Sequence, residues 1–187
     1  MSARLAAAPL DVSPTPRRIA RLRAVVALVW AAALAIAAGD DAGPELSAGL
    51  AALVTAYPVI DVVASLTEPA RGGDRSRLLQ VNAAIGTLAV AALAGAAFGS
   101  DVSAVLAVFG TWAFVSGAIQ LANAVHRRRA GTRELPMIVS GALSALAGIS
   151  FIASSGGDDP SLTPLAGYAA FGAALFLLWA YRTRTSA

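Results

Sequence analysis

The chain has 187 residues, of which 57% are hydrophobic and only 13% are charged, whereas about 25% of the residues of an average soluble domain are charged. The formal net charge is +3, and all 14 basic residues are arginines. The sequence contains no lysine and no cysteine, which excludes Schiff-base cofactors, disulfides, thiolate metal sites and a cysteine nucleophile. The composition indicates an integral membrane protein.

The hydrophobic residues fall into six segments, each close to the roughly 20 residues that a helix needs to cross about 30 Å of hydrocarbon. Residues 1–18 hold three prolines and no apolar periodicity, so we expect a disordered cytoplasmic tail there, and residues 182–187 form a second tail. The chain is therefore predicted to be an all-α, polytopic membrane protein with six transmembrane helices. The expected spans are residues 19–38, 46–66, 78–98, 102–125, 135–155 and 165–181.

The first span has a second interpretation as a secretory signal peptide. Residues 17–23 would form its basic region, residues 24–36 its apolar core, and Ala35-Ile36-Ala37 a cleavage-like triplet. The tail before it is long for a signal peptide, and cleavage would leave the second span without its hairpin partner. Both points favour a membrane span.

The arginines predict the orientation in the membrane. They lie in the N-terminal segment up to Arg23, in residues 67–77, in residues 126–134 and in the C-terminal tail. Because short arginine-rich loops resist translocation, we expect both termini to be cytoplasmic in a bacterial inner membrane. The opposite connectors contain no arginine, and their charged residues are all acidic: Asp40, Asp41, Glu45, Asp101, Asp158 and Asp159.

The expected partner is the lipid bilayer, with anionic lipids at the cytoplasmic arginines. Nucleic acid is not expected, because no groove-reading or aromatic-interleaved element accompanies the charge. The sequence does not determine the oligomeric state and leaves a homo-oligomer as an alternative.

An internal repeat is visible. A shift of 55 residues takes Tyr57 to Trp112, Asp61 to Ser116 and Gly86 to Gly141, and the last span follows more loosely with Tyr168 and Gly172. This spacing predicts three parallel helical hairpin repeats packed into one bundle.

Small residues predict where the helices touch, because helices in lipid associate through close backbone approach. On the third span Ala91, Gly95 and Gly99 recur every fourth residue. The fifth span has a small-residue face at Ser140, Gly141, Ser144 and Gly148. We expect both faces to form helix contacts, so that leucine at Gly95 or Gly141 would destabilise the bundle.

Polar residues are concentrated in the half of the spans nearer the arginines. On the fourth span the 4, 4, 3 spacing of Trp112, Ser116, Gln120 and Asn123 places them on one helix face. With Tyr57, Asp61 and Asn82 they form a candidate intramembrane polar site. They would either line a cytoplasm-facing cavity or make hydrogen bonds between helices.

Asp61 is the most informative member of this site, because a carboxylate inside a membrane is costly and is a functional candidate by default. We expect a partly desolvated carboxyl group hydrogen-bonded to Ser116, Gln120 or Asn82. The alternative is an ion pair with an arginine of the following loop, Arg71, Arg75 or Arg77.

Catalytic patterns are not found. The single histidine, His126, cannot supply a bis-histidine haem or a three-ligand zinc site. No His-Glu-x-x-His motif and no serine paired with a histidine or lysine base occurs. The sequence therefore predicts a protein that is not an enzyme and holds no metal or cofactor.

The residues from Val108 to Leu121, the arginine turn after them and the residues from Ser140 to Gly148 resemble the short membrane repeat of the HdeD-like acid-resistance proteins. The likeness covers residues 20–181 and is best over 100–155. It implies a six-helix bacterial inner-membrane protein linked to acid or general stress, with a structural or interaction role. This chain departs from the pattern at Asp61-Val62, where the fourth span has Ser116-Gly117, and Asp61 supports the alternative of a small transporter or proton pathway.

The orientation is testable with reporter fusions. A reporter placed after Arg184 is expected in the cytoplasm and one inserted within residues 156–159 outside, because the arginines orient the spans. Alkaline phosphatase and green fluorescent protein activities measure the two locations. A cytoplasmic reporter at residues 156–159 would contradict the six-span arrangement, and a mature N-terminus near Ala38 would establish the signal peptide.

Overall fold

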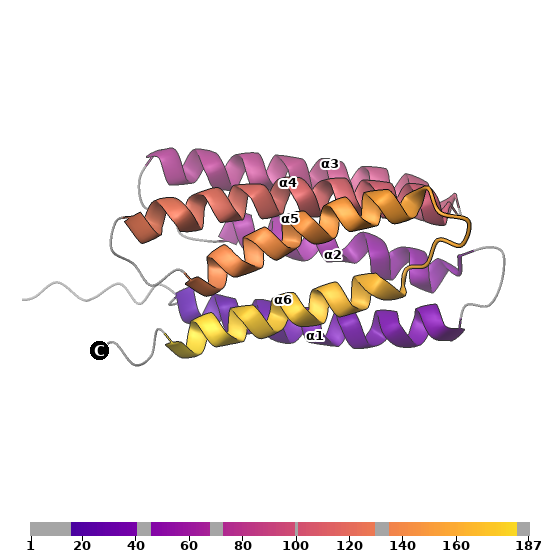
Figure 1. Cartoon of the computed structure of the whole chain (residues 1–187), viewed down its shortest axis with the longest axis horizontal. Helices are drawn as coiled ribbons and strands as arrows, with labels where there is room; N and C mark the ends of the chain where they lie inside the picture. Colours follow the sequence, from indigo (N-terminus) through magenta and orange to yellow (C-terminus); the bar gives the residue numbers. More distant parts are fainter. Residues whose placement is uncertain (1–15, 41–45, 68–72, 100, 130–134, 183–187) are drawn as a thin grey trace, which may run out of the picture.

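The structure, a computed structural model, describes residues 16–40, 46–67, 73–99, 101–129 and 135–182. This part of the chain contains six helices and no strand (Figure 1). The all-α, polytopic membrane fold is thereby confirmed. The helices are α1 (Pro16–Asp40), α2 (Ala48–Thr67), α3 (Gly73–Phe98), α4 (Val102–Arg129), α5 (Leu135–Ser155) and α6 (Thr163–Arg182).

Five of these helices, α1 to α5, are long and apolar enough to cross a membrane. The apolar stretch of α6, Thr163–Leu178, is shorter, but the whole helix has 20 residues and so extends about 30 Å. Helix α1 begins at Pro16 and α6 ends at Arg182. The first and last helices therefore extend beyond the spans expected for them, 19–38 and 165–181. Residues 1–15 and 183–187 of the expected tails lie outside the described residues.

Side chains at the helix starts satisfy N–H groups that have no partner within the helix. Ser47 accepts a hydrogen bond from the backbone nitrogen of Leu50 at 3.2 Å, and Asp101 accepts one from Ala104 at 2.8 Å. Both are residue types preferred just before a helix. These caps fix the starts of α2 and α4 at the end of the bundle opposite the arginines.

The helices form a closed ring in which each packs on two neighbours, in the order α1, α2, α3, α4, α5, α6 and back to α1. The interface of α4 with α5 is the most extensive, followed by α1 with α6 and α2 with α3. The contacts within the predicted hairpins, α1 with α2, α3 with α4 and α5 with α6, are smaller. The repeats are thus joined chiefly through the second helix of one and the first helix of the next. Helix α1 lies beside α6, as Figure 1 shows.

Burial follows the internal repeat. A shift of 55 residues takes the buried α2 residues Leu50, Ala51, Val54 and Pro58 to the buried α4 residues Val105, Leu106, Phe109 and Ala113. From α4 to the last helix the shift is 56 residues, one more than between the first two copies. It takes Leu106, Phe109, Gly110, Ala113, Gly117 and Ala124 to Leu162, Leu165, Ala166, Ala169, Ala173 and Ala180, all of them buried.

Four glycines explain the extensive contact between α4 and α5. Gly110 faces Gly148, and Gly117 faces Gly141, in an antiparallel register. A methyl group added at any of the four would come within 2.5–2.7 Å of the other helix's backbone atoms. The two backbones therefore touch directly, which is the geometry that small residues permit between membrane helices.

Helices α2 and α3 repeat this register with larger side chains. Gly86 of α3 faces Val62 of α2, whose side chain would lie 2.5 Å from an added methyl group. The 55-residue shift takes Gly86 to Gly141 and Val62 to Gly117. Because Val62 stands where α4 has a glycine, the α2–α3 pair has a less extensive contact than α4–α5.

The expectation for Gly95 is wrong. Gly95 is exposed, and nothing lies within 4 Å of a methyl group built on it. Ala91 is exposed as well. The face of α3 that contacts other helices instead contains Ala83, Gly86, Ala89, Leu93 and Ala97.

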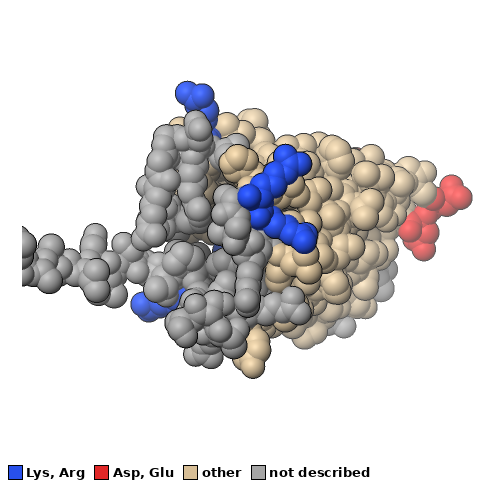
Figure 2. All heavy atoms as spheres, turned by 60° about the vertical axis from the view of Figure 1, so that its left-hand side comes forward, with Lys and Arg blue, Asp and Glu red and all other residues tan. Residues whose placement is uncertain are grey.

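Exposed charges separate to the two ends of the bundle. Arg18 at the start of α1, Arg77 near the start of α3 and Arg128 and Arg129 at the end of α4 lie at one end. Figure 2 shows the basic side chains at this end and acidic side chains at the opposite end. The exposed acidic residues of the described chain are Asp101, Asp158 and Asp159.

The glycine contacts generate a paired test. Gly141→Leu should lower the free energy of unfolding by about 3 kcal/mol or more, because the side chain meets a backbone that cannot rotate away. Gly95→Leu adds the same atoms to an open surface and should leave stability unchanged or slightly higher. Thermal unfolding in detergent compares the two variants, and equal stability would show that Gly141 is not at a helix contact.

Candidate intramembrane polar site

The carboxylate of Asp61 lies at the centre of a hydrogen-bonded chain that joins three helices. Its Oδ1 accepts a hydrogen bond from Arg23 of α1 at 2.5 Å, and its Oδ2 accepts one from Asn82 of α3 at 2.7 Å. The same Asn82 nitrogen donates to the hydroxyl of the buried Ser65 at 2.9 Å. Asp61 is 16% exposed and Arg23 25%, so the pair is only partly shielded from its surroundings.

Arg23 and Asp61 meet because they lie at the same depth. Arg23 is seven residues after the start of α1, and Asp61 is six residues before the end of α2. Each is therefore about 10 Å from the arginine-bearing end of its helix. Both lie inside the candidate spans, 21–39 and 48–66. A charge at this depth is costly alone, and the pairing offsets that cost.

Arg23 also contacts the last helix. Its guanidinium carbon lies 4.9 Å from the centre of the Phe176 ring of α6, within the range of a cation–π interaction. Phe176 and Tyr57 pack against a small cluster formed by Ala24, Ala27 and Ala173. The guanidinium group thus contacts a carboxylate of α2 and an aromatic ring of α6, and that ring packs against small apolar side chains.

An aromatic cluster fills the centre of the bundle next to this ion pair. The ring of Tyr57 lies 4.3 Å from Trp30, 5.8 Å from Phe109 and from Trp112, and 6.2 Å from Tyr168, measured between ring centres. These separations are typical of favourable aromatic pairs. Phe151 of α5 extends the cluster through Phe109 and Tyr168. Tyr57, Trp112 and Tyr168 occupy equivalent positions of the three repeats.

Two polar groups of the cluster bind between helices. The indole nitrogen of Trp30 donates to the carbonyl oxygen of Leu53 at 2.6 Å. This carbonyl is next to that of Val54, which has no helical donor because Pro58 lacks an N–H group. On the other side of the bundle, the hydroxyl oxygens of Ser144 and Tyr168 lie 2.6 Å apart in a hydrogen bond.

The indole nitrogen of Trp112 is buried without an acceptor among the described residues. The side chain is 5% exposed and sits edge-on to Tyr57 and Phe109. Buried polar groups without a partner are uncommon in folded proteins. Its neighbours in the cluster are aromatic rings, and none of them accepts a hydrogen bond from the Trp112 nitrogen.

The structure brings together only part of the expected site. Tyr57 and Trp112 are in contact, and Asn82 is bonded to Asp61 as one of the three expected alternatives. Ser116 instead bonds to the Ala113 carbonyl of its own helix at 3.5 Å. Gln120 donates to the Met137 carbonyl of α5 at 3.4 Å. Asn123 is half-buried further along α4. The expected face of α4 is therefore divided between the aromatic cluster and the α5 interface.

The arginine partner of Asp61 was not foreseen. The sequence directs attention to Arg71, Arg75 and Arg77, whereas the structure pairs Asp61 with Arg23. Arg71 lies outside the described residues, and Arg77 is exposed. The sequence does hold a signal for this pair, namely the depth of the two residues. Arg23 and Asp61 carry opposite charges and lie the same number of helical turns from one side of the membrane. Phe176 and Ser65 carried no sequence signal for this site.

The geometry of the site is that of an electrostatic pair. The carboxylate accepts hydrogen bonds from a guanidinium group and an amide. Among the described residues, no group of three or more histidine, aspartate or glutamate side chains lies together in a way that could hold a metal ion. What this arrangement can do is hold a cation inside the span.

Comparison with known proteins gives one match. Residues 82–153, from Asn82 in α3 to Ala153 in α5, match a family model described as a short repeat of unknown function, DUF308. The segment covers less than half of the chain and contains α4, its glycine contacts with α5 and the equivalent of the Tyr57 position. The match supports the repeat and its membrane helices. No curated protein and no solved structure matches the chain.

The ion pair can be measured with a double-mutant cycle. Arg23→Ala and Asp61→Ala should show a coupling free energy of about 1.5–3 kcal/mol, the range for hydrogen bonds to charged groups, nearer the lower value because both side chains are partly exposed. Arg18→Ala with Asp61→Ala is the matched control, since Arg18 is exposed at the end of the same helix. Unfolding in detergent provides the values, and additive effects in the Arg23 cycle would mean that the pair does not stabilise the fold.

Proposed function

We propose that the chain is a non-enzymatic protein of the bacterial inner membrane, with both termini cytoplasmic, that has a structural or interaction role under acid or general stress. The observation that supports a non-catalytic role is the use of the intramembrane polar side chains. They bond to one another across helices, as in Arg23–Asp61–Asn82 and Ser144–Tyr168. Such bonds tie helices together in lipid.

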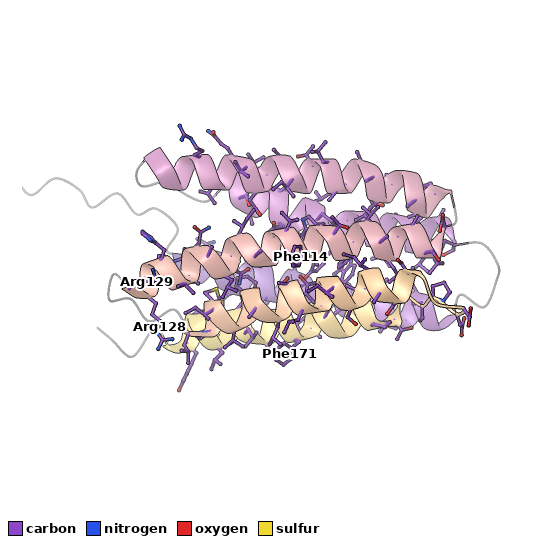
Figure 3. The ribbon with its side chains drawn as sticks, turned by 45° about the horizontal axis from the view of Figure 1, so that its top comes forward. Phe114, Arg128, Arg129 and Phe171 are labelled. Atoms are coloured by element: carbon purple, nitrogen blue, oxygen red, sulfur yellow. The ribbon has the colours of Figure 1, made fainter. Side chains whose placement is uncertain are left out.

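The stress role rests on the resemblance to HdeD-like acid-resistance proteins. The best-matching part of that resemblance, residues 100–155, overlaps the DUF308 match at residues 82–153. The membrane surface itself is the proposed partner at the basic end. Figure 3 shows Arg128 and Arg129 at the end of α4, where both are exposed and well placed for anionic headgroups. Phe171 of α6, also labelled there, is exposed along the apolar length of the bundle, where lipid tails would cover it.

A second candidate function is a small transporter or proton pathway. The observation that favours it is Asp61, an ionisable side chain that lies within a span and stays 16% exposed. Intramembrane carboxylates commonly mark ion pathways. In this structure the carboxylate is held by Arg23 and Asn82, which favours the structural role.

The two functions give different results in proteoliposomes and in cells. Under the proposed role, vesicles with the purified protein dissipate an imposed pH gradient no faster than empty vesicles, while loss of the gene lowers survival after acid shock. A pH-sensitive dye measures the first and colony counts the second. Complementation with Asp61→Asn should restore survival only in part, because the variant keeps an oxygen for Asn82 but leaves the Arg23 charge without its carboxylate partner.

Two outcomes would contradict the proposed role. A proton flux that the Asp61→Asn variant abolishes would establish the pathway in place of the structural role. Equal survival of the deletion strain and its parent under acid and other stresses would remove the stress assignment.

A further inference from the structure

The guanidinium group of Arg23 is held as a bound ligand would be. Its partners come from two other helices: the carboxylate of Asp61 on α2 and the ring face of Phe176 on α6. A carboxylate facing an aromatic ring is a usual arrangement for recognising organic cations. The exposed arginines of the described chain, such as Arg18, Arg77 and Arg128, lie at the end of the bundle instead.

The carboxylate is positioned without help from Arg23. Asn82 donates to Oδ2 of Asp61, and the same amide nitrogen donates to Ser65, which is 5% exposed. These bonds join α2 to α3, whose backbones also meet at Gly86 and Val62. Removing the Arg23 side chain therefore leaves the carboxylate oriented and one of its oxygens without a donor.

The apolar surroundings of the site favour binding of a cation to the carboxylate. The Phe176 ring that the guanidinium group faces packs, with Tyr57, against the apolar cluster of Ala24, Ala27 and Ala173. Apolar neighbours strengthen the attraction between a cation and a carboxylate, because the local dielectric constant is lower than that of water. Arg23 is 25% exposed, so the site is not sealed. It lies about 10 Å from the arginine-bearing end.

We propose that Asp61, Asn82 and Phe176 form a binding site for a small guanidinium-type organic cation, which the side chain of Arg23 occupies in this structure. Arg23 acts as an internal competitor: a free cation binds when the flexible arginine side chain turns toward the membrane surface. This proposal does not depend on the stress role and goes beyond it, since it assigns a ligand class to Asp61 and Asn82, which the proposed function uses only to join helices.

The test uses the full chain in detergent and chemical replacement of the missing side chain. Arg23→Ala should be less stable than the wild type, and methylguanidinium at millimolar concentration should raise its unfolding temperature with saturation. Methylurea, which is similar in shape but neutral, should have no effect. The wild type should need at least about tenfold more methylguanidinium, because a tethered arginine has an effective concentration in the millimolar range or above. Tryptophan fluorescence follows unfolding.

Second substitutions locate the site. Arg23→Ala with Asp61→Asn should lose the response to methylguanidinium, since the carboxylate is absent. Arg23→Ala with Phe176→Leu should weaken the response about three- to tenfold, as expected for loss of one cation–π contact. Phe171→Leu, on the exposed side of the same helix, is the matched control and should leave it unchanged.

Two results would overturn the proposal: no saturable stabilisation of Arg23→Ala, or an equal response in the variant that also carries Asp61→Asn. If Arg23→Ala is not recovered folded, Arg23→Leu replaces it, because leucine keeps apolar volume in the span and leaves the Asp61 oxygen without a donor. Recovery of folded Arg23→Ala only from extraction in methylguanidinium would itself support the site.

Discussion

Direct contact of the α4 and α5 backbones at Gly110, Gly117, Gly141 and Gly148 is the feature around which the bundle is arranged. Lipid tails are as apolar as the side chains of the helices, so burying those side chains does not drive association in a membrane. Dispersion contacts between closely spaced backbones replace that driving force, and only glycine permits such spacing here. The pair α2–α3 repeats the register with Val62 in place of one glycine and has a less extensive contact.

Where backbone contact is small, polar and aromatic side chains join the helices. The interface of α1 with α2 is one of the smaller ones, yet it contains the Arg23–Asp61 pair, the bond from Trp30 to the Leu53 carbonyl and the ring contact of Trp30 with Tyr57. The bundle therefore uses two means of association: glycine contacts on the α4–α5 side and specific side-chain contacts on the α1–α2 side. Tyr57 links the two, because its ring also touches Phe109 and Trp112 of α4.

Much of this arrangement follows from sequence. The lengths of the hydrophobic segments predict the helices, and the 55-residue shift predicts that Tyr57 and Trp112 occupy equivalent positions. The small-residue rule succeeds for Gly141 and fails for Gly95, because spacing shows which residues share a face and not whether a neighbour covers it. The same limit explains Asp61: Asn82 was among its expected partners, whereas Arg23 was not. That pairing depends on packing of α1 beside α2 at matching depth, which no local pattern of residues specifies.

The closure of the ring between α1 and α6 bears on how the protein is made. Of the six helices, α1 leaves the ribosome before the others, but its most extensive partner is α6, the last of the six. During that interval α1 carries Arg23 into the lipid without Phe176. Asp61 belongs to the very next helix, so the partner of Arg23 is available before α6 is made. The ion pair joins the first two helices without requiring α6, which completes the ring.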